Sequence, residues 1–551
     1  MKTPNRSNRY APIIIAVSLV FGIAIGTFFA DRFSGNRLSI INTSSNKLND
    51  LLHIIDEQYV DTVNISDLVE QAMPQILSEL DPHSSYIPAK KAATDNDDLK
   101  GSFSGVGVQF TIKNDTVYVT NVIHGGPAEK AGVIAGDRIV SINGKKYVGK
   151  DVVSFDETVH KLKGEKGSKV KLGLARGGRK LDVSIIRGDI PVVSIDAAYM
   201  LTPQLGYIRV KQFGETTYPE LLVALAHLEQ ENFEGLVIDL RGNGGGYLAA
   251  AIQLVNEFLP KDKLIVYTQG RKSKRQDYKS DGRGSYQHIP LIVLTDETTA
   301  SSAEIFSGAI QDNDRGIIVG RRTYGKGLVQ ESMDFSDGSL IHLTIARYYT
   351  PSGRCIQKPY EKGNVRDYDM DIITRYKRGE FFNEDSIKQT GQKYYTSIGR
   401  TVYGGGGIMP DFFVAEDTTL FTPYYLECAK NGLISEFGFN YTDQHRKELS
   451  KLKSGTAIEE FLRSQHVIEQ FIRYADSHGI KRRNNMIRHS QSLFEESIYG
   501  NVIYNMLSTE DYLKYINKQD PTVIKAIQLF NQHKTTPMVE RKTGKNKRAK
   551  R

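Results

Sequence analysis

TDETTASSAEIFSGAIQDNDRGIIVGRRTYGKGLVQ, residues 295–330, is the stretch on which the predicted fold and chemistry both depend. The apolar run Pro290–Asp296 leads into it and predicts a buried strand. Apolar residues then recur at helical spacing from Ala303 to Ile310. The stretch therefore predicts a strand, a tight turn and a helix that starts at Ser301, which is the kind of unit from which α/β folds are built.

Ser301 and Lys326 are residue types that can work together in acyl transfer. At the start of a helix, unpaired backbone N–H groups and the positive end of the helix dipole suit an oxygen that becomes negative. Lys326 follows a second predicted strand, Gly316–Gly320. A lysine amine can act as a base when burial lowers its pKa, and serine–lysine pairs are an accepted nucleophile–base arrangement.

Two other interpretations compete with this one. Ser301 and Glu304 form S-x-x-E, a capping box that can serve the helix alone, and this alternative stays open. The run Gly320–Lys326 is close to a nucleotide-binding P-loop. However, Gly327 stands where a P-loop has its magnesium-binding Ser or Thr, and Leu328–Phe335 alternates like a strand where a P-loop requires a helix.

Four motifs occur together in the chain: TASSAE around Ser301, QDNDRG from Gln311, YGKGLVQ around Lys326 and DLRGNGGG from Asp239. This set resembles the carboxyl-terminal processing (tail-specific) serine proteases. The resemblance implies that Ser301 is the nucleophile, that Lys326 is the base and that Gln330 orients the lysine. It implies no metal and no cofactor.

The glycine-rich motif departs from the family pattern at Gly244, where a proline is usual, and TASSAE has Ser-Ser-Ala-Glu where Ser-Ala-Ser-Glu is usual. Neither departure affects the nucleophile, the base or the orienting residue. Glycines that end a strand before a helix let backbone N–H groups approach a bound atom. The resemblance implies that Gly245 or Gly246 supplies one oxyanion-hole donor and Ser302 the other.

Residues 101–188 have the spacing of a small β-rich unit, with short alternating runs separated by glycine turns. They resemble a PDZ domain over nearly their whole length. PDZ domains add an extended peptide as a strand and hold its terminal carboxylate on the backbone N–H groups of a Gly-rich loop. The resemblance places that loop at Ser104, Gly105, Val106, Gly107 and Val108.

Residues 11–30 form an uncharged apolar run of about the length that crosses a bilayer. The preceding segment is basic, so the positive-inside rule predicts a single-pass anchor in a bacterial inner membrane with the catalytic part in the periplasm. The alternative is a cleaved signal peptide and a soluble periplasmic product. Phe28 and Phe29 continue the run and favour the retained anchor.

The chain as a whole predicts a multidomain α/β protein. From Leu205 onward, predicted strands (206–210, 234–240 and 264–270) alternate with predicted helices (218–231 and 247–259), whereas Leu420–Asn531 has helical spacing only. The predicted parts are a cytosolic tip and transmembrane anchor (1–30), a helical module (31–100), the PDZ domain (101–188), a protease core (189–415) with a polar insertion (358–396), a C-terminal helical domain (416–540) and a basic tail (541–551). Within these parts, His83 is expected to be a turn residue, and Asp312 is expected to order a neighbouring loop.

The charge distribution argues against a nucleic-acid partner. The formal net charge is +8, but residues 541–551 carry seven positive charges and Lys2, Arg6 and Arg9 add three, so the body between them is slightly acidic. Cys355 and Cys428 lie far apart and match no metal spacing.

These features predict a serine endopeptidase that recognises and cleaves near the C-termini of exported proteins. Its expected partners are protein substrates held by the tail and the membrane; homo-oligomerisation stays open. The main alternative is a catalytically inactive exported PDZ adaptor that binds protein C-termini. A nucleotide-driven enzyme that uses the Lys326 loop is a third candidate, which the missing magnesium ligand disfavours.

Overall fold

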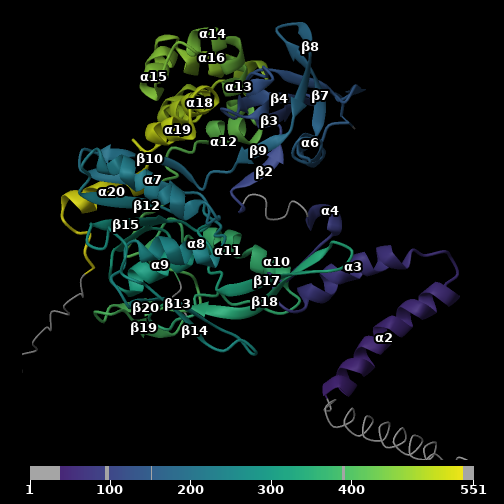
Figure 1. Ribbon diagram of the computed structural model, residues 1–551. Coiled ribbons are helices and arrows are strands. Elements are labelled where there is room, and N and C mark those ends of the chain that lie inside the picture. Colours follow the sequence, from purple (N-terminus) through teal and green to yellow (C-terminus); the bar gives the residue numbers. More distant parts are fainter. Residues whose placement is uncertain (1–36, 93–98, 151, 388–390, 538–551) are drawn as a thin grey trace, which may run out of the picture. The chain divides into compact units, whose positions relative to one another are not determined.

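The computed structural model describes residues 37–92, 99–150, 152–387 and 391–537 (Figure 1). The chain divides into two compact units, Met1–Leu77 and Ser78–Arg551. Helices α2 (Arg37–Gln58) and α3 (Ile65–Ser78) account for the described part of the first unit, up to the boundary. Within the described ranges, no helix combines the length and the apolar character needed to traverse a bilayer. The predicted anchor and basic tail lie outside those ranges.

The PDZ-like region is a β-sheet with two short helices. Its sheet has the order β3 (Val108–Lys113), β4 (Thr116–Val122), β5 (Arg138–Ile142), β7 (Lys169–Arg176), β8 (Arg179–Ile186), and β6 (Lys145–Lys146) pairs with β5. Strand β2 (Ser102–Gly105) pairs separately with β9 (Gly188–Pro191). Helices α5 (Pro127–Lys130) and α6 (Phe155–Leu162) complete the region, and Thr158 and Leu162 of α6 are buried.

The predicted protease core contains a six-stranded sheet between two layers of helices. The order is β10 (Ile195–Thr202), β11 (Leu205–Val210), β12 (Gly235–Asp239), β15 (Leu291–Thr295), β16 (Ile317–Gly320), β21 (Phe412–Phe413), and the strands from β11 onward are parallel. Alternate residues of each strand face opposite layers. Leu236 and Ile238 belong to the cluster formed with α7 (Thr217–Glu229), α8 (Leu248–Asn256) and α9 (Ser302–Asp312), whereas Val237 belongs to the cluster on the opposite face.

The opposite face is covered by the end of the chain. Helices α19 (Thr509–Ile516) and α20 (Pro521–Asn531) contribute Leu513, Val523, Ala526 and Leu529 to that cluster, and α20 packs against β15 and β16. The helices before them form a core of their own. These are α12 (Pro423–Lys430), α13 (Leu433–Gln444), α14 (Arg446–Leu449), α15 (Gly455–Ser464), α16 (Val467–Ser477), α17 (Asn484–His489) and α18 (Gln491–Met506). Helical spacing alone did not reveal that the last two helices complete the α/β core.

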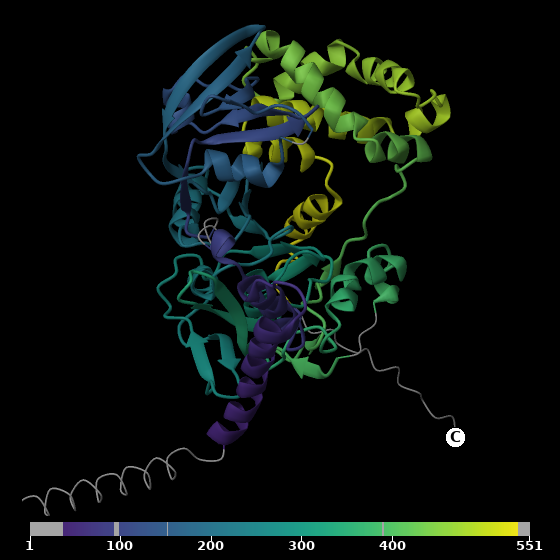
Figure 2. The ribbon, with the colours of Figure 1, turned by 90° about the vertical axis from the view of Figure 1, so that its right-hand side faces the viewer.

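Helix α13 contacts the PDZ-like sheet (Figure 2). Lys113 of β3 pairs with Glu436 at 3.0 Å, and Tyr118 of β4 meets Phe439 edge to face at 5.4 Å between ring centroids. A charged contact and an aromatic contact therefore join these two regions.

A second sheet carries the strand that follows Lys326. It has the order β1 (Ser85–Ile87), β18 (Leu340–Tyr349), β13 (Leu264–Gln269), β14 (Gln276–Lys279), and β17 (Leu328–Asp334) pairs with β18. The predicted strand at 264–270 is therefore present but pairs antiparallel with β14 and β18 instead of joining the parallel sheet. The alternation of strands and helices predicted from the sequence gave no indication of this second sheet.

The predicted insertion at 358–396 is folded onto the core. It forms α10 (Val365–Asp369), α11 (Asp371–Lys377), a short 3₁₀ turn (Glu384–Ser386) and β19 (Lys393–Tyr395), which pairs with β20 (Thr401–Tyr403). Asp312, at the end of α9, binds the loop just before this segment: its carboxylate accepts a hydrogen bond from the Ser352 hydroxyl at 2.7 Å and pairs with Arg354 at 2.8 Å. Asp312 thus orders a neighbouring loop, as predicted.

We expect Asp312→Ala to lower the free energy of unfolding of the core by about 3–5 kcal/mol, because it leaves the Arg354 guanidinium buried without its carboxylate. Both side chains of the pair are fully buried. Urea-induced unfolding of the core tests this. The matched control is Asp182→Ala, which breaks an exposed pair with Lys171 and should change the unfolding free energy by no more than about 0.5 kcal/mol. Similar losses in the two variants would contradict the prediction.

Candidate active site

Ser301 lies at the carboxyl edge of the parallel sheet, immediately before α9, in a strained backbone conformation. Its φ of 56° and ψ of −118° are values that residues with a side chain rarely adopt. Two hydrogen bonds fix the preceding turn. The Thr299 hydroxyl donates to the Leu240 carbonyl and the Ala300 N–H donates to the Asn243 carbonyl, each at 2.9 Å. The turn keeps Ser301 partly exposed at the edge where α/β proteins bind ligands.

Lys326 and Gln330 are in direct contact. The Lys326 amine donates to Gln330 Oε1 at 2.9 Å, and the Gln330 amide nitrogen donates to the backbone carbonyl of His83. Strand β17 has an irregularity against β18 between Val329 and Gln330. Such bulges redirect side chains, and here the glutamine lies against the lysine that precedes the strand.

The pKa of Lys326 is set by opposing effects. Burial lowers the pKa below the ordinary lysine value, and the carboxylates of Glu304 and Asp81 act in the opposite direction to a smaller extent. Since burial dominates, Lys326 loses its proton at a lower pH than an exposed lysine does. A neutral amine is the form that can accept a proton from a hydroxyl group.

A buried carboxylate joins the turn that carries Ser301 (residues 299–301, the serine turn) to the loop that carries Lys326 (residues 321–327, the lysine loop). Glu304 is fully buried, and its Oε2 accepts from the Ser301 N–H at 2.9 Å and from the Lys326 N–H at 2.8 Å. Its Oε1 accepts from the Gly325 N–H at 2.8 Å and from the Thr323 hydroxyl at 2.5 Å. Burial raises the pKa of Glu304 to about 7, although these four hydrogen bonds lower it. One carboxylate thus sets the distance between the two main chains.

Tyr348 of β18 provides a second link between the same two residues. Its buried hydroxyl lies within hydrogen-bonding distance of the Lys326 carbonyl and of the Ser301 carbonyl, the latter at 3.1 Å. The contact of Glu304 with the Ser301 N–H is also part of the predicted capping box. Capping and site assembly are therefore compatible, because the same carboxylate serves both.

The glycine loop packs directly against the serine turn. A Cβ on Gly245 would lie 2.7 Å from Cβ of Ser301, and one on Gly246 would lie 2.2 Å from the Phe213 carbonyl oxygen, so neither position has room for a side chain. The Ser302 hydroxyl donates to the Gly246 carbonyl at 2.7 Å. Gly245, Gly246 and Ser302 are therefore brought together beside Ser301. The Gly245 N–H donates to Asn243 Oδ1 at 2.8 Å, so this one of the two predicted donors already has an acceptor.

The predicted carboxylate loop of the PDZ-like region connects β2 to β3. Val106 is buried and Gly107 has a φ of 80°. The carbonyls of Val106 and Gly107 accept from the Ala128 and Ile123 N–H groups at 2.8 and 3.0 Å, which fixes the loop. Strand β3 ends the order of its sheet, so one edge is open to an added strand among the residues that the structure describes.

Comparison with known proteins identifies the family. Residues 204–369 match peptidase family S41 and residues 104–186 match the PDZ domain. The carboxy-terminal processing protease CtpA of Bacillus subtilis (strain 168) is 33% identical over 380 residues, which cover 67% of this chain and 80% of that protein. The chain belongs to the carboxy-terminal processing proteases.

Two further similarities were found. The carboxy-terminal-processing protease of Bartonella bacilliformis is 37% identical over 320 residues, which cover 56% of this chain and 72% of that protein. The solved structure of a photosystem II D1 C-terminal processing protease is 26% identical, covers 67% of this chain and 92% of that one, and has a TM-score of 0.35. This processing protease is accordingly a serine-type peptidase, and the recognition made from the motifs is confirmed.

The turn before the PDZ domain is part of the processing protease's candidate site. Asp81 Oδ1 accepts from the His83 N–H at 2.9 Å and from the Thr344 hydroxyl at 3.0 Å, so His83 lies in a turn held against β18. The His83 carbonyl is what Gln330 contacts. Burial and, to a smaller extent, the charge of Lys326 lower the pKa of His83 to about 4. The run Asp81-Pro82-His83 predicts a turn, but nothing in the sequence indicates that this turn lies close to Lys326.

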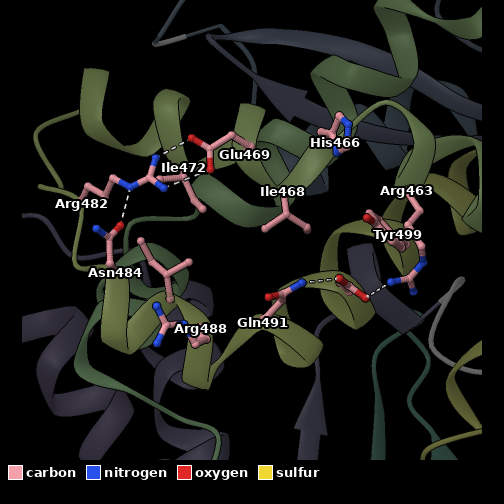
Figure 3. Close-up of a pocket in the computed structure, with 12 residues that line it drawn as sticks. Arg463, His466, Ile468, Glu469, Ile472, Arg482, Asn484, Arg488, Gln491 and Tyr499 are labelled. Atoms are coloured by element: carbon pink, nitrogen blue, oxygen red, sulfur yellow. Dashed lines mark hydrogen bonds and ion pairs between the residues drawn. The ribbon is translucent and has the colours of Figure 1, made fainter.

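A separate cavity of about 550 Å³ lies in the C-terminal helices, where residues 424–508 match a family of unknown function (Figure 3). Two of its arginines are paired: Arg482 with Glu469 at 2.5 Å and Arg463 with Glu495 at 2.9 Å. Ile468 and Ile472 line it between these pairs. None of the candidate catalytic residues lines this cavity.

Proposed function

We propose that this processing protease uses a Ser301–Lys326 dyad to cut proteins near their C-termini. The observation that carries the proposal is the single Glu304 oxygen that accepts hydrogen bonds from the backbone N–H groups of both residues. The lowered pKa of Lys326 and its contact with Gln330 support the role of the amine as a base.

In the proposed reaction, the Ser301 hydroxyl attacks the peptide carbonyl and the neutral Lys326 amine takes its proton. The carbonyl oxygen becomes negative and accepts from the backbone N–H groups of Gly246 and Ser302, with Gly245 as the alternative to Gly246. The C–N bond then breaks, and the lysine ammonium gives its proton to the leaving amine. Water, deprotonated by the same lysine, releases the acyl group and restores the hydroxyl of Ser301.

We propose that the PDZ domain holds the substrate by its tail. The terminal carboxylate would accept from backbone N–H groups of the loop Ser104–Val108, and the residues before it would add a strand to the open edge of β3. The fixed loop carbonyls and the terminal position of β3 in its sheet support this assignment. Capture of the tail explains why cleavage would occur near C-termini.

We expect Ser301→Ala and Lys326→Ala to abolish cleavage of a protein with an apolar C-terminus and to leave binding of its tail unchanged. Mass determination of the products and calorimetry with a tail peptide measure the two effects. Ser332→Ala, in an exposed residue of β17, is the control and should cut like the unmodified enzyme. Full activity of either active-site variant would eliminate the dyad. Tail binding without cutting by the unmodified protein would instead support the adaptor.

We expect kcat/KM to rise with pH as Lys326 loses its proton, with a midpoint below the ordinary lysine pKa because burial lowers this pKa. Asp81 raises the pKa of Lys326, so Asp81→Asn should move the midpoint to lower pH. The pH profile of peptide cleavage measures this shift, and Asp337→Asn, in an exposed turn, is the control. A midpoint that stays in place or moves upward in Asp81→Asn would contradict the assignment of the base.

We propose that residues 11–30 anchor the protease in a bacterial inner membrane, with the PDZ domain and core in the periplasm. Their apolar character and the basic segment before them support this. We expect the full chain to stay with membranes after carbonate extraction and to be digested by protease added to spheroplasts. A shorter soluble periplasmic product would favour the cleaved signal peptide, and resistance to the added protease would overturn export.

A further inference from the structure

Residues 358–380 come from the polar insertion, yet several of their charged and aromatic side chains are buried against the lysine loop. Lys358, Tyr368, Arg375 and Glu380 each expose less than a tenth of their surface. Burying ammonium and guanidinium groups is unfavourable unless they have partners. The partners of these groups show what the segment does.

Arg375 holds the stretch that leads to Lys326. Its guanidinium donates to the carbonyl of Arg322 at 2.7 Å and to that of Thr323 at 3.0 Å. Glu380 accepts from Arg375 at 3.2 Å and from the Arg322 side chain at 2.6 Å. The insertion is therefore joined to the backbone only a few residues before the proposed base.

Lys358 lies between two tyrosine rings. Its ammonium nitrogen is 3.9 Å from the ring centroid of Tyr324 and 4.0 Å from that of Tyr368. It also donates to the Tyr368 carbonyl at 3.1 Å and pairs with Asp371 at 3.3 Å. Tyr324 belongs to the Tyr-Gly-Lys-Gly turn, so this cation–π contact connects the insertion to the turn that carries Lys326.

Tyr368 is linked to Lys326 indirectly, through a second set of hydrogen bonds. Its hydroxyl lies 3.1 Å from Gln357 Nε2 and 2.8 Å from His83 Nε2. The hydroxyl accepts from the Gln357 amide and shares a hydrogen bond with the His83 ring, whose tautomer sets the direction of that bond. The His83 carbonyl in turn accepts from Gln330, which binds the Lys326 amine.

We propose that residues 358–380 form a brace that positions Lys326, with Tyr368 acting through His83 and Gln330 and with Lys358 acting through Tyr324. The inference rests on the proposed role of Lys326 as the base. Tyr368 and Lys358 are positioning residues, since neither contacts Ser301 or Lys326 directly. Their loss should reduce the fraction of molecules in which the amine is correctly placed, which lowers kcat more than it changes KM.

We expect Tyr368→Phe to lower kcat about tenfold and to change KM by less than about twofold. Tyr376→Phe is the matched control, because Tyr376 lies in the same segment with about half of its surface exposed and should keep full kcat. Lys358→Met should cause a loss similar to that of Tyr368→Phe. Lys358→Arg should recover part of it, because a guanidinium also stacks on aromatic rings.

A double-mutant comparison separates positioning from general destabilisation. If Tyr368 acts through Gln330, adding Tyr368→Phe to Gln330→Ala should cause no further loss of kcat. Additive losses, or unmodified kcat in both Tyr368→Phe and Lys358→Met, would overturn the brace. Unmodified cleavage by Lys326→Ala would overturn the proposed function instead, so the two failures are distinguishable. Melting temperature and tail-peptide affinity establish that each variant is folded.

Discussion

The candidate active site depends on one constraint: the buried Glu304 carboxylate must accept hydrogen bonds from four donors that come from two loops. A buried carboxylate without such partners would be strongly unfavourable. The serine turn and the lysine loop can therefore not separate without leaving buried hydrogen-bonding groups unpaired. The strained backbone of Ser301 is held by two contacts: Glu304 accepts from its N–H, and the Tyr348 hydroxyl lies 3.1 Å from its carbonyl oxygen.

Strand β12, which precedes the glycine loop, is held by helix α20 from the C-terminal region. Asp239, at the end of β12, pairs with Arg241 at 2.7 Å, and Arg241 also pairs with Asp520 at 2.6 Å at the start of α20. Helix α20 buries its apolar face on the sheet beside β12. The C-terminal helices therefore contribute to the position of the glycines that face Ser301, although they lie well outside the segment that matches peptidase family S41.

The sequence was sufficient to predict the elements that carry the candidate catalytic residues. The strand and helix around Ser301, the strand after Lys326 and the glycine loop after Asp239 are all present. They were predictable because local periodicity and turn residues determine each of them within a few positions. The contact of Gln330 with Lys326 also agrees with the resemblance, since the two residues are near neighbours in the chain.

Long-range contacts were not predictable in this way, because no local pattern records which distant groups satisfy a buried donor or charge. Tyr348, Tyr368 and the His83 carbonyl meet Lys326 or its partners only through tertiary folding, and the polar insertion has buried cations that its composition did not suggest. The sequence by itself thus determined the family, the local elements around Ser301 and Lys326, and the candidate catalytic residues. Tertiary structure alone decided how those groups are held, since the requirement to pair every buried polar atom is met only across the folded core.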